Sequence, residues 1–192
     1  MLDLIHRCFE TKWEKIMTRN IILTGAMGSG KSTVLKLLNR KGFITVEEPA
    51  RPILAEQRSI EGVGVPDKNP ELFVQLLLSR AIFQYKMMQE KDNLVIYDRG
   101  IPDNIGYAEI FRLETKYAEI ASKLFRYETH VFFFPGWKDI YATDDERKMS
   151  FEAANAFGDN VRKIYQNCDY SIIDVPYVSP EERAHFIIEQ LN

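Results

Sequence analysis

A glycine-rich turn constrains this chain more than any other stretch of its sequence. Residues 25–32 read Gly-Ala-Met-Gly-Ser-Gly-Lys-Ser and fit the pattern G-x-x-x-x-G-K-[ST] at every position. The apolar pair Ile21-Ile22 precedes the turn, and apolar residues at helical spacing follow it. Glycine loses more backbone entropy on folding than any other residue, so such a run indicates a backbone that must curve closely around something. A strand, this turn and then a helix are typical of a phosphate-binding loop.

The chemistry expected of this loop is the binding of a nucleoside triphosphate. Backbone N–H groups of the loop and the positive end of the next helix converge on one anion. Lys31 is placed to reach the β- and γ-phosphates, and Ser32 to offer a hydroxyl to Mg²⁺. We expect ATP and Mg²⁺, with GTP as the alternative nucleotide. The candidate nucleotide-binding residues are Gly25, Ala26, Met27, Gly28, Ser29, Gly30, Lys31, Ser32 and Thr33.

Five short apolar stretches predict strands that are covered on both faces. They span residues 20–25, 43–48, 93–98, 130–135 and 170–175. Segments with helical spacing lie between them, the longest from about residue 70 to 91. Alternating strands and helices of this kind predict an α/β fold in three layers, with a parallel sheet between two layers of helices.

Composition excludes several classes of protein. The net charge of −3 shows no basic footprint, so nucleic acid is not an expected partner. The apolar runs are too short to cross a bilayer, and we expect no transmembrane segment. The two cysteines form no CxxC pair, which argues against a disulfide framework or a thiolate metal site and favours the cytoplasm.

We divide the chain into an N-terminal extension, residues 1–18, and one domain, residues 19–192. In the extension, Leu2, Ile5, Phe9 and Trp13 recur at helical spacing, which allows an amphipathic helix. The alternative is that the start is assigned too early, because Met17 lies shortly before the first predicted strand. We expect no catalytic residue in this segment.

The end of the third predicted strand separates the classes of protein that carry such a loop. Asp98 is placed to hold Mg²⁺ there, directly or through water. Its neighbour is Arg99, where many ATPases have a glutamate that activates water, and an arginine suits the clamping of an anion. No N/T-K-x-D segment for reading guanine is present. Residues 103–106 spell D-x-x-G, which we interpret as a chance match in a loop. The pattern therefore favours a kinase.

Two adjacent carboxylates, Glu47 and Glu48, end the second predicted strand. In an open α/β sheet this edge borders the ligand crevice. A carboxylate there can accept the proton of a hydroxyl as that hydroxyl attacks the γ-phosphate. Glu48 is the better candidate, because alternation along a strand turns only one of the two toward the site and Pro49 keeps Glu48 out of the helical region. The alternative is a pair of solvated loop acids.

A third polar cluster follows the fourth predicted strand, in residues 135–154. Residues 144–146 are acidic and suit a helix start, with Arg147 and Lys148 immediately after them. A basic lid supplies charge to the transition state of phosphoryl transfer, which makes these two residues candidates. A solvated, salt-bridged helix start explains the same composition equally well.

Together these segments resemble a known family. The phosphate loop, "VEEPAR", "YDRGIPDNIGYAE", "FFFPGWKDIYATDDERKMSFEAA" and "IIDVPYVSPEERAHFII" resemble the small AAA-domain family of P-loop ATPases and kinases. That family is similar to the ribosylnicotinamide kinase domain of a bifunctional NAD-biosynthesis protein. The resemblance covers residues 19–190. The pattern W-x-x-I-Y-x-x-D-x-E-R, from Trp137 to Arg147, is its most specific part.

The resemblance implies a five-stranded sheet of nucleoside- and nucleotide-kinase type, with strand order 2-3-1-4-5 and a helical lid. It also implies that Glu48 is the base and that Arg99 lies beside the phosphates, by similarity to the E-P and E-R-S patterns of deoxynucleoside kinases. This chain has Asp98 where those kinases carry glutamate, so the division of roles between Glu48 and Asp98 stays open. In such folds the acceptor pocket is built from variable segments, here residues 51–85 and 101–125.

Our leading hypothesis is a Mg²⁺-dependent kinase that moves the γ-phosphoryl group of ATP to a hydroxyl of a small, nucleoside-like acceptor. The candidate catalytic residues are Lys31, Glu48, Asp98, Arg99 and Arg147, with Ser32 and Asp98 as metal ligands. The alternative is an ATP- or GTP-binding switch, or a slow NTPase, with a protein or lipid partner. A third hypothesis has a nucleoside monophosphate as acceptor, clamped by Arg51, Arg80 and Arg99. The sequence leaves the acceptor and the oligomeric state open.

Overall fold

The computed structural model describes residues 18–89, 93–142 and 149–191. Its sheet has the strand order β2-β3-β1-β4-β5, and every neighbouring pair is parallel. The strands are β1 (Arg19–Gly25), β2 (Ile44–Val46), β3 (Leu94–Asp98), β4 (His130–Phe134) and β5 (Ser171–Asp174). All five predicted strands and the predicted order are confirmed.

Helices connect the strands on both sides of the sheet. They are α1 (Lys31–Arg40), α2 (Ala50–Ser59), α3 (Pro70–Met88), α4 (Asp103–Ile110), α5 (Lys116–Leu124), the 3-10 turn η1 (Lys138–Ile140), α6 (Phe151–Asn167) and α7 (Pro180–Leu191). The assignment of residues 103–106 to a loop is wrong, because they form the first turn of α4. Residues 103–108 are buried on all sides, so α4 shows none of the amphipathic spacing that marks a surface helix.

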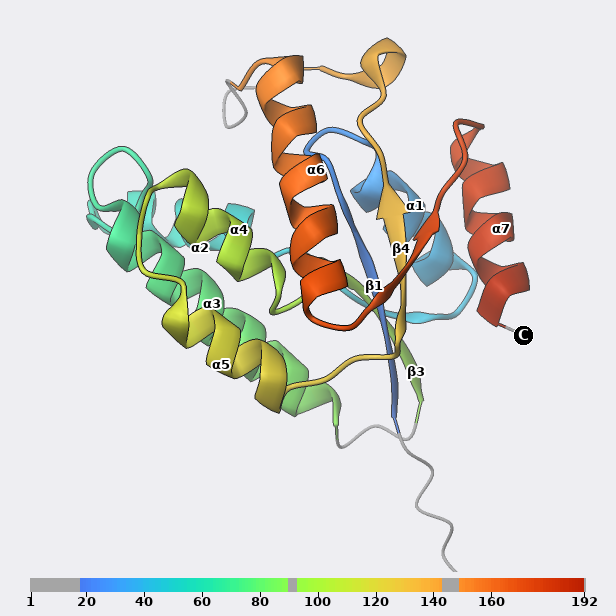
Figure 1. Ribbon diagram of the computed structural model, residues 1–192, viewed down its shortest axis with the longest axis horizontal. Helices are drawn as coiled ribbons and strands as arrows, with labels where there is room; N and C mark the ends of the chain where they lie inside the picture. The colour runs from blue at the N-terminus through green and yellow to red at the C-terminus, as the bar shows by residue number, and fades with distance from the viewer. Residues whose placement is uncertain (1–17, 90–92, 143–148, 192) are drawn as a thin grey trace, which may run out of the picture.

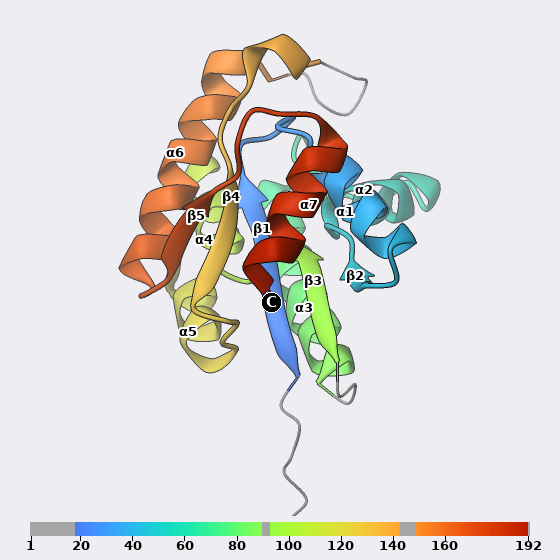
Figure 2. The ribbon, with the colours of Figure 1, turned by 90° about the vertical axis from the view of Figure 1, so that its right-hand side faces the viewer.

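One face of the sheet is covered by α1 and α7, which lie side by side in Figures 1 and 2. Alternate residues of the central strands, such as Leu23 and Phe132, point to this side and pack against Leu35, Leu38 and helix α7. Residues one position along face the other way, as period-2 side-chain alternation requires. Each central strand is therefore apolar throughout, and the sheet lies in the middle of three layers (Figure 2).

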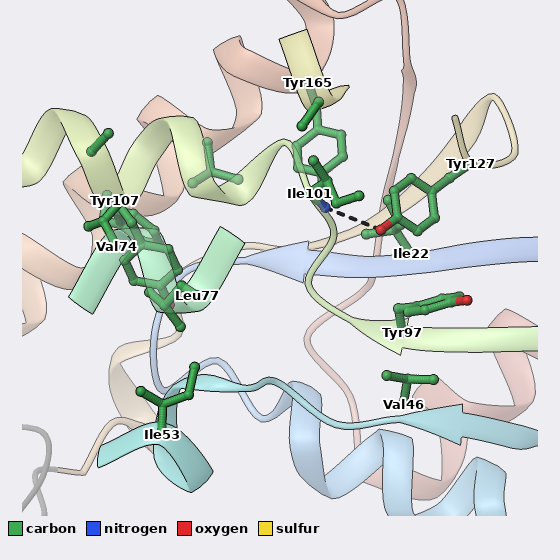
Figure 3. Packing of buried hydrophobic residues seen from close by; sticks show 14 of the residues in the cluster. Ile22, Val46, Ile53, Val74, Leu77, Tyr97, Ile101, Tyr107, Tyr127 and Tyr165 are labelled. Atoms are coloured by element: carbon green, nitrogen blue, oxygen red, sulfur yellow. Dashed lines mark hydrogen bonds between the residues drawn. The ribbon is translucent and has the colours of Figure 1, made fainter. Parts of the chain in front are cut away.

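Helices α2 to α6 cover the opposite face with a larger core that is rich in tyrosine. Figure 3 shows Ile22, Tyr97 and Val46 beside neighbouring strands on this face. Tyr127 lies over Tyr97 with ring centroids 5.3 Å apart. Its hydroxyl accepts a hydrogen bond of 3.3 Å from the backbone N–H of Ile101 (Figure 3). This contact anchors the segment that leads from β3 into α4.

At the carboxyl edge of the sheet, the second strand is shorter than predicted. Strand β2 ends at Val46, so Glu47 and Glu48 lie in the connection to α2 rather than on the strand. The predicted helix start at residues 144–146 and the lid candidates Arg147 and Lys148 lie outside the described residues. Helix α6 begins at Phe151, capped by the Ser150 hydroxyl, which accepts a hydrogen bond of 3.2 Å from the N–H of Ala153. None of the helices described is long and apolar enough to cross a membrane.

Candidate active site

The phosphate loop starts with a close approach of two backbones. Gly25 has φ of +130°, and a Cβ added to it would lie 2.1 Å from the carbonyl oxygen of Phe134 on β4. That same oxygen accepts a hydrogen bond of 3.0 Å from the N–H of Ala26. Only glycine meets both requirements, because a side chain would clash with the backbone and is rarely compatible with this φ. Strand β4 thus fixes where the loop leaves the sheet.

Further along the loop, Gly28 and Gly30 also have positive φ, and Gly30 is the residue before helix α1. The Ser29 hydroxyl donates a hydrogen bond of 2.8 Å to the carbonyl oxygen of Ala26, closing the turn on itself. These contacts leave the N-terminus of α1 directed at the turn, where the helix dipole favours an anion. The loop therefore has the shape that the motif predicted.

Lys31 is buried at the base of this loop. Its Nζ donates a hydrogen bond of 2.8 Å to the carbonyl oxygen of Ala26. Burial, with the positive charge of Arg99 nearby, lowers the pKa of Lys31 from 10.5 to about 8, although the carboxylates around it act in the opposite direction. The ammonium group is thus poorly solvated, and a phosphate would restore a charged partner to it.

Ser32 and Asp98 form a pair suited to a divalent cation. The Ser32 hydroxyl donates a hydrogen bond of 2.6 Å to Oδ2 of Asp98. Among the described residues, Oδ1 of Asp98 is the buried side-chain atom that has no hydrogen-bond partner. Burial raises the pKa of Asp98, and the positive charge of Lys31 offsets only part of this effect. An unpaired carboxylate oxygen next to a hydroxyl fits Mg²⁺, which takes few protein ligands when phosphates and water supply the others. The described residues hold no cluster of three or more His, Cys, Asp or Glu that would form a separate metal site.

Glu48 lies close enough to Asp98 for its charge to raise the pKa of Asp98, and it is held by two donors. Arg99 Nε donates a hydrogen bond of 2.8 Å to Oε1 of Glu48, and the Tyr107 hydroxyl donates to the same oxygen. Burial alone would raise the pKa of Glu48. The positive charges of Arg99 and Lys31, with the two hydrogen bonds, outweigh it and lower the pKa. Glu48 is therefore a carboxylate at neutral pH. Its neighbour Glu47 is exposed and does not line the cavity.

Arg99 joins the carboxylate of Glu48 to the phosphate loop. Besides its bond to Glu48, Nη1 of Arg99 donates to the carbonyl oxygen of Gly25 at 3.1 Å and to Oδ1 of Asp103 at 2.9 Å. The backbone of Arg99 has φ of +68°, a region that residues other than glycine adopt rarely and that is enriched at functional sites. The guanidinium group is thus a buried brace between Glu48 and the loop.

Asp103 is the second carboxylate that pairs with Arg99. Its Oδ1 accepts hydrogen bonds from Thr24 Oγ1 at 2.7 Å and from Arg99. Its Oδ2 accepts them from the N–H of Gly100 at 2.9 Å and from the Tyr165 hydroxyl at 2.6 Å. Asp103 is 1% exposed, so these four donors replace the water that the charge has lost. The carboxylate therefore ties β1, α4 and α6 to the arginine.

Lys31, Ser32, Glu48 and Arg99 line one open cavity of about 700 Å³. Its phosphate side is formed by Met27, Gly28, Gly30, Lys31, Ser32 and Thr33. Gly25, Ala26 and Ser29 shape the loop behind it. Its other side is formed by Ala50, Arg51, Leu54, Pro66, Phe73, Tyr107, Ile110 and Phe111, with Glu48 and Arg99 between the two sides. Apart from Ala50, this second side comes from the segments, 51–85 and 101–125, in which the resemblance places the acceptor pocket.

The family-specific tryptophan lies at the rim of the phosphate loop. The guanidinium of Arg183, on α7, lies 4.5 Å from the centroid of the Trp137 ring. Nη1 of Arg183 donates a hydrogen bond of 2.9 Å to the carbonyl oxygen of Ser29, and Nε donates one of 2.9 Å to that of Val178. Ile140 also approaches the loop, because a Cβ added at Gly30 would lie 3.4 Å from its Cδ1. The segments after β4 and β5 thus both reach the nucleotide side of the cavity.

Residues 20–183 match the model of a family described as an AAA domain. The chain belongs to this AAA-domain family. The match covers most of the chain and confirms the family that the sequence motifs indicated. Among curated proteins, the comparison finds no match.

Solved structures of kinases share the fold of this AAA-domain protein. Deoxyadenosine kinase from M. mycoides, solved with dCMP and dCDP, superposes with a TM-score of 0.67 at 15% identity, covering 90% of this chain and 98% of that one. Thymidylate kinase from Candida albicans gives 0.64 at 16% identity, covering 91% of each chain. The NadR protein in complex with NR gives 0.63 at 18% identity, covering 91% of this chain and 51% of NadR. At these identities the likeness concerns the fold.

Sequence reasoning missed three residues of this site: Asp103, Tyr107 and Arg183. Asp103 and Tyr107 are four residues apart, the spacing that places side chains on one face of a helix, and this spacing could have revealed them had a helix been predicted here. Arg183 follows Ser179, which caps α7: Ser179 Oγ accepts from the N–H of Glu182 at 3.3 Å. The helix cap accounts for this stretch of sequence, so nothing in the sequence indicated that Arg183 contacts the phosphate loop.

Proposed function

We propose that this AAA-domain protein is a Mg²⁺-dependent kinase that transfers the γ-phosphoryl group of ATP to a hydroxyl of a small, nucleoside-like acceptor. The observation that carries the proposal is the position of Glu48. Its carboxylate shares one cavity with the phosphate loop and has a lowered pKa. A phosphate cradle facing an ionised carboxylate is the arrangement that in-line transfer to a hydroxyl needs.

In this mechanism the residues of the chain bind the phosphates and move one proton. Lys31 and the loop N–H groups hold the β- and γ-phosphates, and Ser32 and Asp98 would hold Mg²⁺. When bound, the metal neutralises charge on the phosphate oxygens. The acceptor hydroxyl loses its proton to Glu48, its oxygen forms a bond to the γ-phosphorus, and the bond to the leaving ADP breaks. Arg99 holds Glu48. Arg147 remains a proposed lid residue outside the described part of the chain.

The lining of the acceptor side supports an aromatic, uncharged acceptor. Phe73, Tyr107 and Phe111 contribute rings, and Leu54 and Pro66 contribute further apolar surface. Such walls suit the base of a nucleoside. Deoxyadenosine kinase and thymidylate kinase share the fold, so both nucleoside and nucleotide acceptors are compatible with it.

The arginines favour the nucleoside over the monophosphate. Arg80 forms a two-pronged ion pair with Glu56, at 3.2 and 2.8 Å, and does not line the cavity. Arg99 is committed to Glu48 and Asp103. Arg51 is the remaining arginine of the three proposed as a phosphate clamp, and it lines the cavity.

The first experiment is a transfer assay with Mg²⁺-ATP and a pool of nucleosides, nicotinamide riboside, sugars and nucleoside monophosphates. We expect transfer to one nucleoside and little ATP hydrolysis without it. Glu48→Gln should lower transfer on the order of 100- to 10,000-fold while ATP affinity stays unchanged. Glu47→Gln is the matched control and should retain full transfer. Full transfer by Glu48→Gln would contradict the base role. Tight ATP or GTP binding with no transfer at all would favour the nucleotide switch.

A further inference from the structure

The Tyr107 hydroxyl is the second donor to Glu48, the proposed base, and no sequence motif predicted this contact. Tyr107 lies on α4, where its ring packs against Phe157 with centroids 5.3 Å apart and lies 5.7 Å from the Arg99 guanidinium. The ring lines the cavity beside Glu48. The residue is 8% exposed, so both its ring and its hydroxyl are held by packing.

The two hydrogen bonds on Glu48 are unequally distributed over its carboxylate. Arg99 Nε, at the end of β3, and the Tyr107 hydroxyl, on α4, both donate to Oε1. Rotation of the carboxylate would break both bonds at once. The oxygen that takes part in neither bond is Oε2.

We propose that Tyr107 is a positioning residue, which together with Arg99 fixes the Glu48 carboxylate so that Oε2 receives the proton of the acceptor hydroxyl. The inference rests on the proposed function, because it assigns one oxygen of the proposed base to the reaction. It adds a residue that touches the base, through the hydrogen bond of the Tyr107 hydroxyl to Oε1 of Glu48.

The charges around Glu48 determine what removal of this hydroxyl does. The groups that interact with it are Lys31 from α1, Asp98 and Arg99 from the end of β3, and Tyr107 from α4. Arg51 from α2 lines the same cavity. The hydrogen bond from Tyr107 is one of the interactions that lower the pKa of Glu48 against the effect of burial. Without it the charged form loses a donor, so the pKa rises and the base is protonated at a higher pH.

The test uses Tyr107→Phe, which keeps the ring and removes the hydroxyl. Titration of the Glu48 carboxyl by ¹³C NMR, with the signal assigned by its absence in Glu48→Gln, should show a higher pKa in Tyr107→Phe. With the nucleoside identified in the transfer assay, kcat should fall about tenfold while KM for ATP and acceptor changes less than about twofold. The acid limb of the kcat profile should move to higher pH. A role in packing alone would not move it.

Two further variants keep the test decisive. Tyr97→Phe is the matched control, because its hydroxyl bonds to Asn20 at 3.1 Å in the same core and does not touch Glu48. It should leave the titration and kcat unchanged. If Tyr107→Phe does not fold, 3-fluorotyrosine at position 107, a stronger donor, should lower the pKa of Glu48 instead.

An unchanged Glu48 titration in the position-107 variants would overturn the proposal. So would a shifted titration with an unchanged kcat. Failure of the proposed function is a separate result: the unmodified protein would phosphorylate none of the compounds, whereas the titration would still show whether Tyr107 holds the carboxylate.

Discussion

At the scale of single residues, the site depends on how buried charges are paired. Arg99 and Asp103 are both almost fully buried, and each would be expensive to bury alone. Arg99 lies between two carboxylates, Glu48 in front and Asp103 behind. Asp103 in turn takes four donors, so neither charge is left without partners. Through these ion pairs, the position of α4 determines where the Glu48 carboxylate is held.

Replacement of Asp103 tests this pairing. In Asp103→Asn, Arg99 keeps Glu48 but loses its second buried carboxylate. We expect the free energy of unfolding to fall by about 3 kcal/mol, the low end of the effect of breaking a buried ion pair. Urea denaturation measures it. The matched control is Glu56→Gln in the exposed Arg80–Glu56 pair, which should leave the unfolding free energy nearly unchanged because water screens that pair. Equal effects in the two variants would argue against the buried brace.

At the scale of elements, helix α6 supports the phosphate loop through a glycine. A Cβ added at Gly158 would lie 2.9 Å from Cα of Ala26, closer than real Cβ contacts allow. Next to Gly158 on the same helix, Phe157 and Val161 lie against Gly106 of α4, each 3.2 Å from a Cβ added there. Small residues thus let α6 pack closely against both α4 and the loop that binds phosphate.

The two glycines make different predictions. In Gly158→Ala the new methyl group meets backbone, so the loop or the helix must move, and we expect Mg²⁺-ATP affinity to fall about tenfold or more. In Gly106→Ala the methyl group meets side chains, which can shift by a few tenths of an ångström, and affinity should be retained. Calorimetric titration with Mg²⁺-ATP measures both. Unchanged affinity in Gly158→Ala would mean that the loop tolerates the displacement of α6.

At the scale of the whole molecule, the parallel sheet brings the site together from distant parts of the chain. Because neighbouring strands run in the same direction, the ends of β1, β3 and β4 meet at one edge. That edge carries the phosphate loop, the Asp98–Arg99 pair and the backbone that fixes Gly25. Two cores, one on each face, hold the sheet between them, and both include residues of β1.

A chain that begins at Met17 tests the proposed domain start. Because the sequence places the start of the domain at residue 19 and β1 begins at Arg19, we expect its unfolding free energy and its Mg²⁺-ATP affinity to match those of the full chain. Thermal denaturation with and without nucleotide measures both quantities. A marked loss of stability would instead place part of the core in the first sixteen residues.

The sequence predicted the five strands because each is a short apolar run between turn signals. The strand order came from the family resemblance, because periodicity does not say which strands are neighbours. Helices α2, α4 and α5 were not predicted. In α4 the reason is burial on all sides, which removes the amphipathic pattern on which such predictions depend. Because residues 103–106 were therefore assigned to a loop, Asp103 was not recognised as a residue of the site.

The phosphate loop was determined by local sequence, since a turn that needs positive φ and a helix N-terminus are local requirements. The Ser32–Asp98 hydrogen bond joins residues from α1 and the end of β3, and it depends on the pairing of β1 with β3. What only the tertiary structure decided is how the base is held. Glu48, Arg99 and Tyr107 come from separate elements, and their hydrogen bonds exist because the packing of α4 against α6 places one hydroxyl beside one carboxylate oxygen. Contacts between distant segments follow from packing in three dimensions, and a pattern of residues along one chain does not contain them.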